Sequence, residues 1–212
     1  MPDAKRVIAI DGPAGSGKST VAKAVADRLG LAYLDTGAMY RSVAFAALRD
    51  GVDPGDGEAL AKLAGNLDID LGERVLVDGT DATAAIRGPD VTAVVSTVAA
   101  HPAVRAEMVR RQRLWASEHG GGVAEGRDLG TVVFPDADVK VFLTASEEER
   151  ARRRQHDDRA PDVNVVAADL ARRDALDSNR AASPLRPADD AVVIDTTGRT
   201  VDDVVDQVVG LL

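Results

Sequence analysis

Three glycines, a lysine and a serine near the N-terminus have the spacing of a loop that binds phosphate. Residues 12–19 read GPAGSGKS and match the pattern G-x-x-x-x-G-K-[ST] at every fixed position. Glycines let the backbone curl with its N–H groups turned inward, so that a polyphosphate fits the concavity. We expect Lys18 to reach the β- and γ-phosphates of a nucleoside triphosphate and the Ser19 hydroxyl to bind Mg²⁺. The predicted contacts are Gly12, Pro13, Ala14, Gly15, Ser16, Gly17, Lys18, Ser19 and Thr20.

The segments on either side of this loop support the prediction. Val7–Ile10 is a short apolar run, typical of a buried parallel strand. After the loop, Val21, Val25 and Leu29 recur every fourth residue and form one apolar stripe of a helix, which Gly30 is expected to cap. The N-terminus of that helix points at the bound anion. The alternative, a glycine-rich turn with a surface lysine, leaves the glycines and the strand unexplained.

Charged residues follow two further predicted strands, at the sheet edge where ligands of open α/β folds bind. The segment 36–41 follows the strand predicted at Leu31–Asp35, and Arg127 and Asp128 follow the strand predicted at Val123–Glu125. Solvated ion pairs are the alternative interpretation, and such pairs contribute little to stability. The position of Gly126-Arg127-Asp128 at a strand end favours function.

A third group of charges lies on a helix predicted at 165–178. Arg173, Asp177 and Arg180 are spaced i, i+4, i+7, which places them on one helix face. On this spacing alone, a binding site and a set of solvated ion pairs remain equally open.

Composition limits the possible functions. The 212 residues carry a net charge of -9, which argues against a general nucleic-acid binder. Aromatic residues make up only 3%, so arginine planes are more available than rings for stacking on a base. There is no cysteine, and the histidines lack metal-ligand spacing. Because no signal-like segment or spanning apolar run is found, we expect a cytoplasmic protein with no nucleic-acid or membrane partner.

The order of elements predicts an α/β fold. Strands alternate with helices, which gives a parallel sheet flanked by helices on both faces. Short alternating pieces at 67–71, 75–77 and 84–86 predict a small antiparallel sheet inserted into this body. Residues 120–122 are expected to form an exposed glycine turn, Ser146 and Glu149 a capping box, and residues 155–163 a mobile flap.

Beyond the loop, the chain resembles the bacterial cytidylate kinases, nucleoside monophosphate kinases of the phosphate-loop class. The resemblance runs nearly end to end and rests on IDGPAGSGKST, LDTGAMYR, EGRDLGTVVFPDADVKVFL, RRDALDSNR and SPL at Ser183. It implies a five-stranded parallel sheet with a small antiparallel β insertion in the acceptor-binding region and a lid. It implies one domain over residues 1–212, with a core of 1–36, 97–150 and 164–212, an acceptor region of about 37–96 and a lid of about 151–163.

The resemblance also implies two substrates, ATP as phosphoryl donor with Mg²⁺ and CMP or dCMP as acceptor. Arg41, Arg127 and Arg180 would hold the acceptor phosphate, and Ser96 would lie near the base or sugar. On the donor side, one interpretation of residues 147–154 has Arg153 facing ATP when the flap closes, with Arg159 as a second candidate. The alternative is an ordinary helix with i, i+4 ion pairs, Glu148 with Arg152 and Glu149 with Arg153. The implied catalytic group is Lys18, Arg127, Asp128 and Arg180.

The remaining acceptor contacts concern the nucleoside. The resemblance implies that Thr36, Arg105 and Asp128 meet the cytosine edge and that Arg173 and Asp177 reach the ribose. A carboxylate such as Asp128 accepts from the cytosine N4 amino group and would repel the oxygen that uracil has there. The family often has Ser at the position of Thr36 and Asp at that of Glu125, which leaves the fine substrate preference open.

The implied reaction needs no general base, because the acceptor phosphate is already an anionic nucleophile. Catalysis then consists of in-line positioning and charge neutralisation by Lys18, Mg²⁺ and the arginines. We expect a monomer. The alternatives are a kinase acting on a hydroxyl with Asp128 as base, a GTP-dependent switch, and a nucleotide-binding structural module. The second lacks the required N-K-x-D segment, since no Asn-Lys pair occurs.

Overall fold

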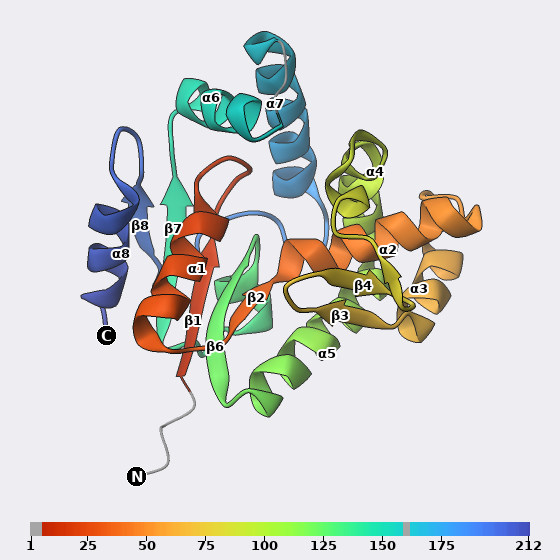
Figure 1. Cartoon of the computed structure of the whole chain (residues 1–212), viewed down its shortest axis with the longest axis horizontal. Helices are drawn as coiled ribbons and strands as arrows, with labels where there is room; N and C mark the ends of the chain where they lie inside the picture. The colour runs from red at the N-terminus through yellow and green to blue at the C-terminus, as the bar shows by residue number, and fades with distance from the viewer. Residues whose placement is uncertain (1–5, 159–161) are drawn as a thin grey trace. The chain divides into compact units, whose positions relative to one another are not determined.

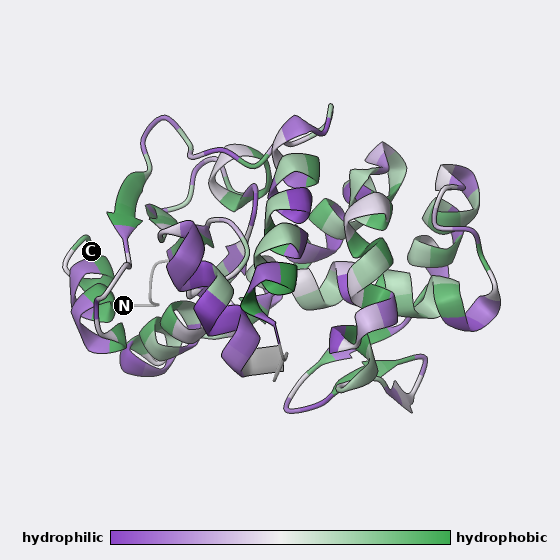
Figure 2. Ribbon diagram, turned by 90° about the horizontal axis from the view of Figure 1, so that it is seen from above, coloured by the Kyte–Doolittle hydropathy of each residue, from purple (hydrophilic) through white to green (hydrophobic). Residues whose placement is uncertain are grey.

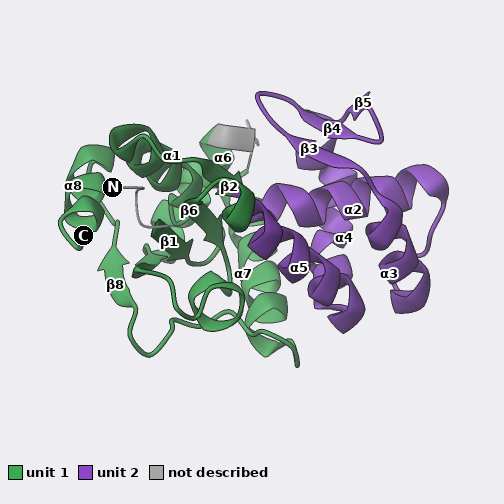
Figure 3. Ribbon diagram, turned by 90° about the horizontal axis from the view of Figure 1, so that it is seen from below, with its two compact units in different colours: residues 1–34, 116–212 green, residues 35–115 purple. Residues whose placement is uncertain are grey.

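The computed structural model of the protein describes residues 6–158 and 162–212. The chain forms two compact units, one of residues 1–34 and 116–212 and the other of residues 35–115 (Figure 3). Within the described residues, none of the helices combines the length and apolar character needed to cross a membrane.

The first unit is built on a five-stranded sheet, as predicted. Its strands lie in the order β2-β6-β1-β7-β8, with β1 at the centre (Figure 1). β1 pairs in parallel with β6 and with β7, and β7 pairs in parallel with β8. The strands are β1 (Arg6–Asp11), β2 (Tyr33–Asp35), β6 (Gly121–Gly126), β7 (Val139–Thr144) and β8 (Val192–Asp195).

Helices cover this sheet and complete its core. They are α1 (Lys18–Leu29), α6 (Glu147–Asp158), α7 (Val163–Asn179) and α8 (Val201–Val209), together with the end of α5 (Pro102–Glu118) and a π-helical turn at Leu129–Val133. Ile8, Val25 and Leu143 are fully buried in the core. Each such side chain contributes about 1.5–3 kcal/mol. The predicted stripe on α1 is confirmed, and Gly30 caps the helix with a φ of 64°.

The second unit contains α2 (Thr36–Asp50), α3 (Gly57–Asn66), α4 (Pro89–Ala100) and most of α5. Its small antiparallel sheet has the order β3-β4-β5, from β3 (Ile69–Leu71), β4 (Val75–Val77) and β5 (Thr80–Asp81). The predicted insertion is therefore confirmed, but its third piece is wrong. Residues Ala85–Arg87 form a 3-10 turn, and the third strand is β5, which follows the Asp78-Gly79 turn. Figure 2 shows hydrophobic and hydrophilic residues alternating along the helices of each unit.

Two other local predictions need correction. Gly121 and Gly122 are buried in β6 rather than exposed in a turn, and only Gly120 is exposed. A Cβ on Gly121 would lie 2.2 Å from the carbonyl oxygen of Arg6, so the close approach of β1 requires glycine there. Residues 155–158, expected in a flap, continue α6, while 159–161, including Arg159, lie outside the described residues.

The capping box predicted before α6 is only half present. The Ser146 hydroxyl accepts from the Glu149 N–H at 3.2 Å. The Glu149 carboxylate instead binds Arg152 and Arg153, because two guanidinium groups one turn further along the helix offer stronger donors than a backbone N–H.

Candidate active site

The glycine-rich loop connects the end of β1 to the start of α1. Gly12, Gly15 and Gly17 have φ angles of 150°, 77° and 87°, which L side chains rarely adopt. At Gly12 a Cβ would also lie 2.2 Å from the Leu143 carbonyl oxygen in β7. The loop therefore needs glycine at Gly12 both for its conformation and for its packing on the sheet.

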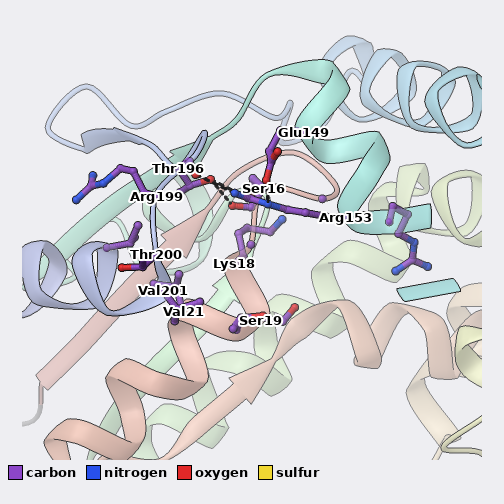
Figure 4. A pocket seen from close by; sticks show the side chains of 15 residues that line it. Ser16, Lys18, Ser19, Val21, Glu149, Arg153, Thr196, Arg199, Thr200 and Val201 are labelled. Atoms are coloured by element: carbon purple, nitrogen blue, oxygen red, sulfur yellow. Dashed lines mark hydrogen bonds and ion pairs between the residues drawn. The ribbon is translucent and has the colours of Figure 1, made fainter. Parts of the chain in front are cut away.

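A cavity of about 360 Å³ opens beside the loop (Figure 4). One wall is the loop and the first turn of α1, Gly15–Val21, which includes the predicted contacts Ser16, Gly17, Lys18, Ser19 and Thr20. The rest of the lining comes from α6, from the segment joining β8 to α8 and from α8 itself, namely Glu149, Arg153, Arg154, Thr196, Arg199, Thr200, Val201 and Val204. The structure thus brings Arg153 to the same cavity as the loop.

Arg153 is held firmly at this cavity. Its Nε donates to Glu149 Oε1 at 2.8 Å, its Nη1 to Thr196 Oγ1 at 2.9 Å and its Nη2 to the Thr196 carbonyl oxygen at 2.8 Å. The Thr196 hydroxyl lies 3.1 Å from the Ser16 carbonyl oxygen (Figure 4). A guanidinium plane fixed in this way offers a flat surface for a planar ligand.

Lys18 lies across the loop that precedes it. Its Nζ donates to the Pro13 carbonyl oxygen at 2.7 Å. The pKa of Lys18 is lowered from 10.5 to about 7, chiefly by burial and also by the positive charge of Arg127. An anion placed in the loop would favour the charged form of this amine, so the site is electrostatically suited to phosphate.

Ser19 shares a carboxylate with a residue of β2. The Ser19 hydroxyl donates to Glu125 Oε2 at 2.9 Å, and the Tyr33 hydroxyl donates to Glu125 Oε1 at 2.6 Å. A hydroxyl beside a carboxylate is the set of hard oxygen donors that Mg²⁺ prefers, so these residues fit the expected metal. Glu125 is not among the ligands predicted from the sequence, although its place at the carboxyl end of β6 is the signal that would have found it.

The charges predicted after β6 and on α7 lie together in the first unit. Arg127 donates from Nε to Asp177 Oδ2 and from Nη1 to the Gly12 carbonyl oxygen, each at 2.9 Å. Arg180 has Nη2 at 3.6 Å from Asp128 Oδ1 and Nη1 at 3.9 Å from Asp177 Oδ1, and its side chain is only 4% exposed. The helical spacing that suggested a shared face is thus confirmed for this pair.

Arg173 adds a further cation to this cluster. It is 93% buried, and its Nε has no hydrogen-bond partner among the described residues. Burial lowers the pKa of Arg173, and the neighbouring charges of Arg127 and Arg154 lower it further. A buried cation next to other cations is costly unless an anion compensates it, so the arrangement favours binding of an anionic ligand.

In the second unit, two of the predicted acceptor residues are fixed by their own surroundings. Arg41 donates from Nη1 to the Ile86 carbonyl oxygen at 2.9 Å and to Thr92 Oγ1 at 3.0 Å. Arg105 donates to the Ala99 carbonyl oxygen at 3.2 Å, and its guanidinium lies 5.3 Å from the centre of the Tyr40 ring. Of the other two predicted residues, Thr36 is buried at the start of α2 and Ser96 is half-buried on α4.

Asp11 was missed by the sequence analysis. Its Oδ1 accepts from the Leu129 N–H at 2.9 Å and its Oδ2 from the Gly130 N–H at 2.8 Å, so it anchors the segment that follows Asp128. The pKa of Asp11 is raised to about 6, chiefly by burial; the two N–H bonds act against this rise, and the nearby Asp128 charge adds to it. An acid at the end of an apolar strand was the available signal.

Arg150 was also missed, and Asp174 was expected only as one of the charges on the helix that became α7, without a role of its own. They pair with each other across α6 and α7, and both contact Ala14 at the tip of the loop. No local sequence pattern links these residues, because α6 and α7 come together only in the folded chain.

Comparison with known proteins places the chain among relatives of similar length and among longer ones. A family model described as cytidylate kinase matches residues 8–212. A cytidylate kinase of Geobacillus kaustophilus is 52% identical over 214 residues, covering 97% of this chain and 95% of that protein. One from Mycolicibacterium paratuberculosis is 53% identical over 209 residues, covering 94% and 92%. A bifunctional pantoate ligase/cytidylate kinase of Synechococcus is 52% identical over 211 residues, which are 94% of this chain but 43% of that protein, so the chain spans less than half of its length.

Solved structures support the fold. An uncharacterized protein from Eubacterium ventriosum is 15% identical with a TM-score of 0.56, over 97% of each chain. A gluconokinase from Sinorhizobium meliloti is 15% identical with a TM-score of 0.50, over 98% of this chain and 92% of that one. The full-length family match and the identity above 50% to named family members together show that the chain belongs to the cytidylate kinase family.

Proposed function

We propose that the protein transfers the γ-phosphoryl group of ATP to CMP or dCMP, giving ADP and CDP or dCDP. The observation that carries the proposal is the position of Arg127, whose guanidinium donates both to the Gly12 carbonyl oxygen of the phosphate loop and to Asp177 of the buried cation cluster. A site for a donor polyphosphate therefore adjoins a site for a second anion. Family membership supports the identity of both nucleotides.

The donor side would use the loop, Lys18 and the Arg153 surface. Backbone N–H groups of residues 15–19 would hold the phosphates, and Lys18 would regain its charge against them. Ser19, with the Glu125 carboxylate beside it, would hold Mg²⁺. When bound, this ion supplies Lewis-acid neutralisation of charge on the phosphoryl oxygens.

The acceptor side needs positioning rather than proton abstraction. The CMP phosphate is an anion at neutral pH, so the protein must hold it in line with the donor and reduce the repulsion between the two nucleotides. Arg173 and the Arg180 side chain are buried, and the half-buried Arg127 lies beside Asp177, so these three cations of the first unit are available for the acceptor phosphate. They would also stabilise the negative charge that develops on the phosphoryl group during transfer. Because these cations are already in place, no solvent has to reorient around that charge.

Contacts to the nucleoside are proposed for both units. In the first unit, Asp128 would accept from cytosine N4, and Asp177 with Arg173 would reach the ribose. In the second unit, Arg41 would bind phosphate, Thr36 and Arg105 the base, and Ser96 the base or sugar. The proposal for these four residues rests on the family resemblance, and it is tested one residue at a time by KM for CMP.

The test is release of ADP from ATP with CMP, dCMP, UMP, AMP and shikimate as separate acceptors. We expect the unaltered protein to turn over CMP and dCMP. Lys18→Ala should show no turnover, because the loop then lacks the cation that neutralises charge on the transferred phosphoryl group. Failure to phosphorylate any pyrimidine monophosphate would overturn the proposal. Faster reaction of shikimate than of CMP would support the alternative, a kinase that acts on a hydroxyl.

A further inference from the structure

The tip of the phosphate loop is held by a partly buried ion pair that the proposed reaction does not use. The Ala14 carbonyl oxygen accepts from Arg150 Nη1 at 3.1 Å, and the Ala14 N–H points at Asp174 Oδ1 at 3.4 Å. Arg150 Nη1 also bonds directly to Asp174 Oδ2. Both polar groups of one peptide residue are thus bound by a single pair of side chains, one from α6 and one from α7.

Apolar packing at the same place leaves no space between the loop and the two helices. Ala14 belongs to a small buried cluster with Ala151 of α6 and with Val166 and Leu170 of α7. At the next loop residue, a Cβ on Gly15 would lie 2.9 Å from the Arg150 carbonyl oxygen. Because packed elements move as bodies rather than deform smoothly, the loop tip is expected to follow any movement of these helices. Figure 1 shows α6 and α7 side by side.

Helix α7, which supplies Asp174, also positions cations of the proposed acceptor site. Asp174 lies next to Arg173 in sequence and one turn before Asp177, and Arg180 follows the last residue of α7. An acceptor phosphate held by Arg173 and Arg180 would fix α7, and α7 grips the donor loop through Asp174. One rigid element therefore links both proposed nucleotide sites.

We propose that Arg150 and Asp174 are positioning residues that couple the two nucleotide sites, so that bound acceptor raises the affinity for donor and bound donor raises the affinity for acceptor. The inference rests on the proposed function, since it requires an acceptor anion at Arg173 and Arg180. Its physical basis is conformational: fixing α7 with the first ligand orders the loop tip, and the second ligand then loses less conformational entropy on binding. The coupling must be equal in both directions.

The experiment measures the affinity of a non-hydrolysable ATP analogue with Mg²⁺ by calorimetry, with and without saturating CMP. For the unaltered protein we expect CMP to tighten analogue binding by about fivefold or more, the lower end of typical coupling. In Asp174→Asn and Arg150→Lys we expect this ratio to fall towards one. Arg150→Lys keeps the charge but loses the planar fork that reaches Ala14 and Asp174 together.

Asp169→Asn is the matched control. It neutralises an exposed acid of the same helix that pairs with Arg172 at 2.6 Å, away from the Ala14 contacts, and it should keep the full coupling ratio. Thermal unfolding of each variant is recorded in parallel. A merely structural ion pair would lower the melting temperature of Asp174→Asn and Arg150→Lys while leaving the coupling ratio unchanged, and that result would overturn the inference.

The remaining outcomes separate this inference from the proposed function. If the unaltered protein binds no CMP, the proposed function fails. If it binds and phosphorylates CMP but shows no coupling, only the inference is wrong. If Asp174→Asn does not fold, Arg150→Lys decides the question, and the reverse titration of CMP with and without the analogue must give the same ratio.

Discussion

Buried charge is the property that distinguishes the residues of this site. Lys18 is a lysine whose ordinary charge is suppressed by burial, and Arg173 is a guanidinium buried beside other cations. Such groups reduce the stability of the empty site, which an anionic ligand restores. At the scale of single residues, the unfavourable burial of these cations therefore indicates an anion-binding site even without a bound ligand.

Lys18 should take up a proton when the donor binds. Its pKa is about 7 in the free protein, and phosphate oxygens placed around it raise that pKa, so at pH 8 binding converts a mostly neutral amine to the charged form. We expect uptake of up to about one proton per bound ATP analogue at pH 8, measured by calorimetry in buffers of different ionisation enthalpy. Lys18→Met should abolish this uptake, and an unchanged uptake in Lys18→Met would contradict the assignment.

Asp128 should control the choice between pyrimidines. Replacement by alanine removes the acceptor for cytosine N4 and also removes the repulsion of uracil O4, so Asp128→Ala should raise KM for CMP and relax the preference against UMP. Steady-state kinetics with both nucleotides give the ratio of kcat/KM. An unchanged CMP/UMP ratio in Asp128→Ala would refute the role of this carboxylate.

Asp11 should make stability depend on pH. Its folded-state pKa of about 6 lies above the ordinary value of 3.8, so the folded protein holds a proton between these values that the unfolded chain has lost. The contribution of Asp11 to the free energy of unfolding is therefore fully present below about pH 4 and is lost as the pH rises through about 6. Urea unfolding of the protein and of Asp11→Asn from pH 4 to 7 should show their difference in stability falling over this range, and a flat difference would contradict it.

At the scale of elements, the loop and α7 have different roles. The loop conformation depends on backbone geometry that only glycine allows, whereas α7 is an ordinary helix whose importance comes from what its side chains reach. Asp162 caps its start by accepting from the Asn164 N–H at 2.8 Å. The Arg173, Asp174 and Asp177 side chains then face the loop and the cation cluster from a single rigid support.

Glycine substitutions should differ according to the space around each position. Gly12→Ala should lower the free energy of unfolding by more than about 3 kcal/mol, because the new methyl meets the Leu143 carbonyl oxygen in addition to the backbone strain. Gly17→Ala has strain but only one neighbour, at 3.4 Å, and should cost about 1–3 kcal/mol. Gly65→Ala in α3 meets nothing within 4 Å and is the control, with a small gain in stability expected from denaturant unfolding. Equal effects at all three positions would contradict the packing argument.

At the scale of the whole molecule, the site is locally positive although the chain as a whole is negatively charged. The chain carries a net charge of -9, yet it gathers buried arginines where an anion must bind. Exposed acids also lie on helices of the surface, as on α8, where Asp202 and Asp206 lie near Arg28. Screening weakens the repulsion from distant exposed charges, while the partly buried cations act on a bound phosphate at short range.

Ligand binding should therefore stabilise the protein through the phosphate of the acceptor. At 100 times its dissociation constant, CMP should raise the free energy of unfolding by about 2.7 kcal/mol. Cytidine at the same concentration should raise it far less, because it lacks the group that the arginine cluster binds. Thermal unfolding with each ligand tests this, and equal shifts for CMP and cytidine would place the binding energy on the base instead.

The phosphate loop, the order of strands and helices, two strands of the inserted sheet and the charged segments after β6 and on α7 could all be predicted from the sequence. These are local or periodic features, and their physical causes act over a few residues. The contacts between distant groups could not be predicted in this way: Ser19 with Glu125, Arg127 with Gly12, and Arg150 with Asp174 at Ala14. Such pairs depend on the packing of elements far apart in the chain, and the burial that sets the pKa values of Lys18 and Asp11 exists only once that packing has formed.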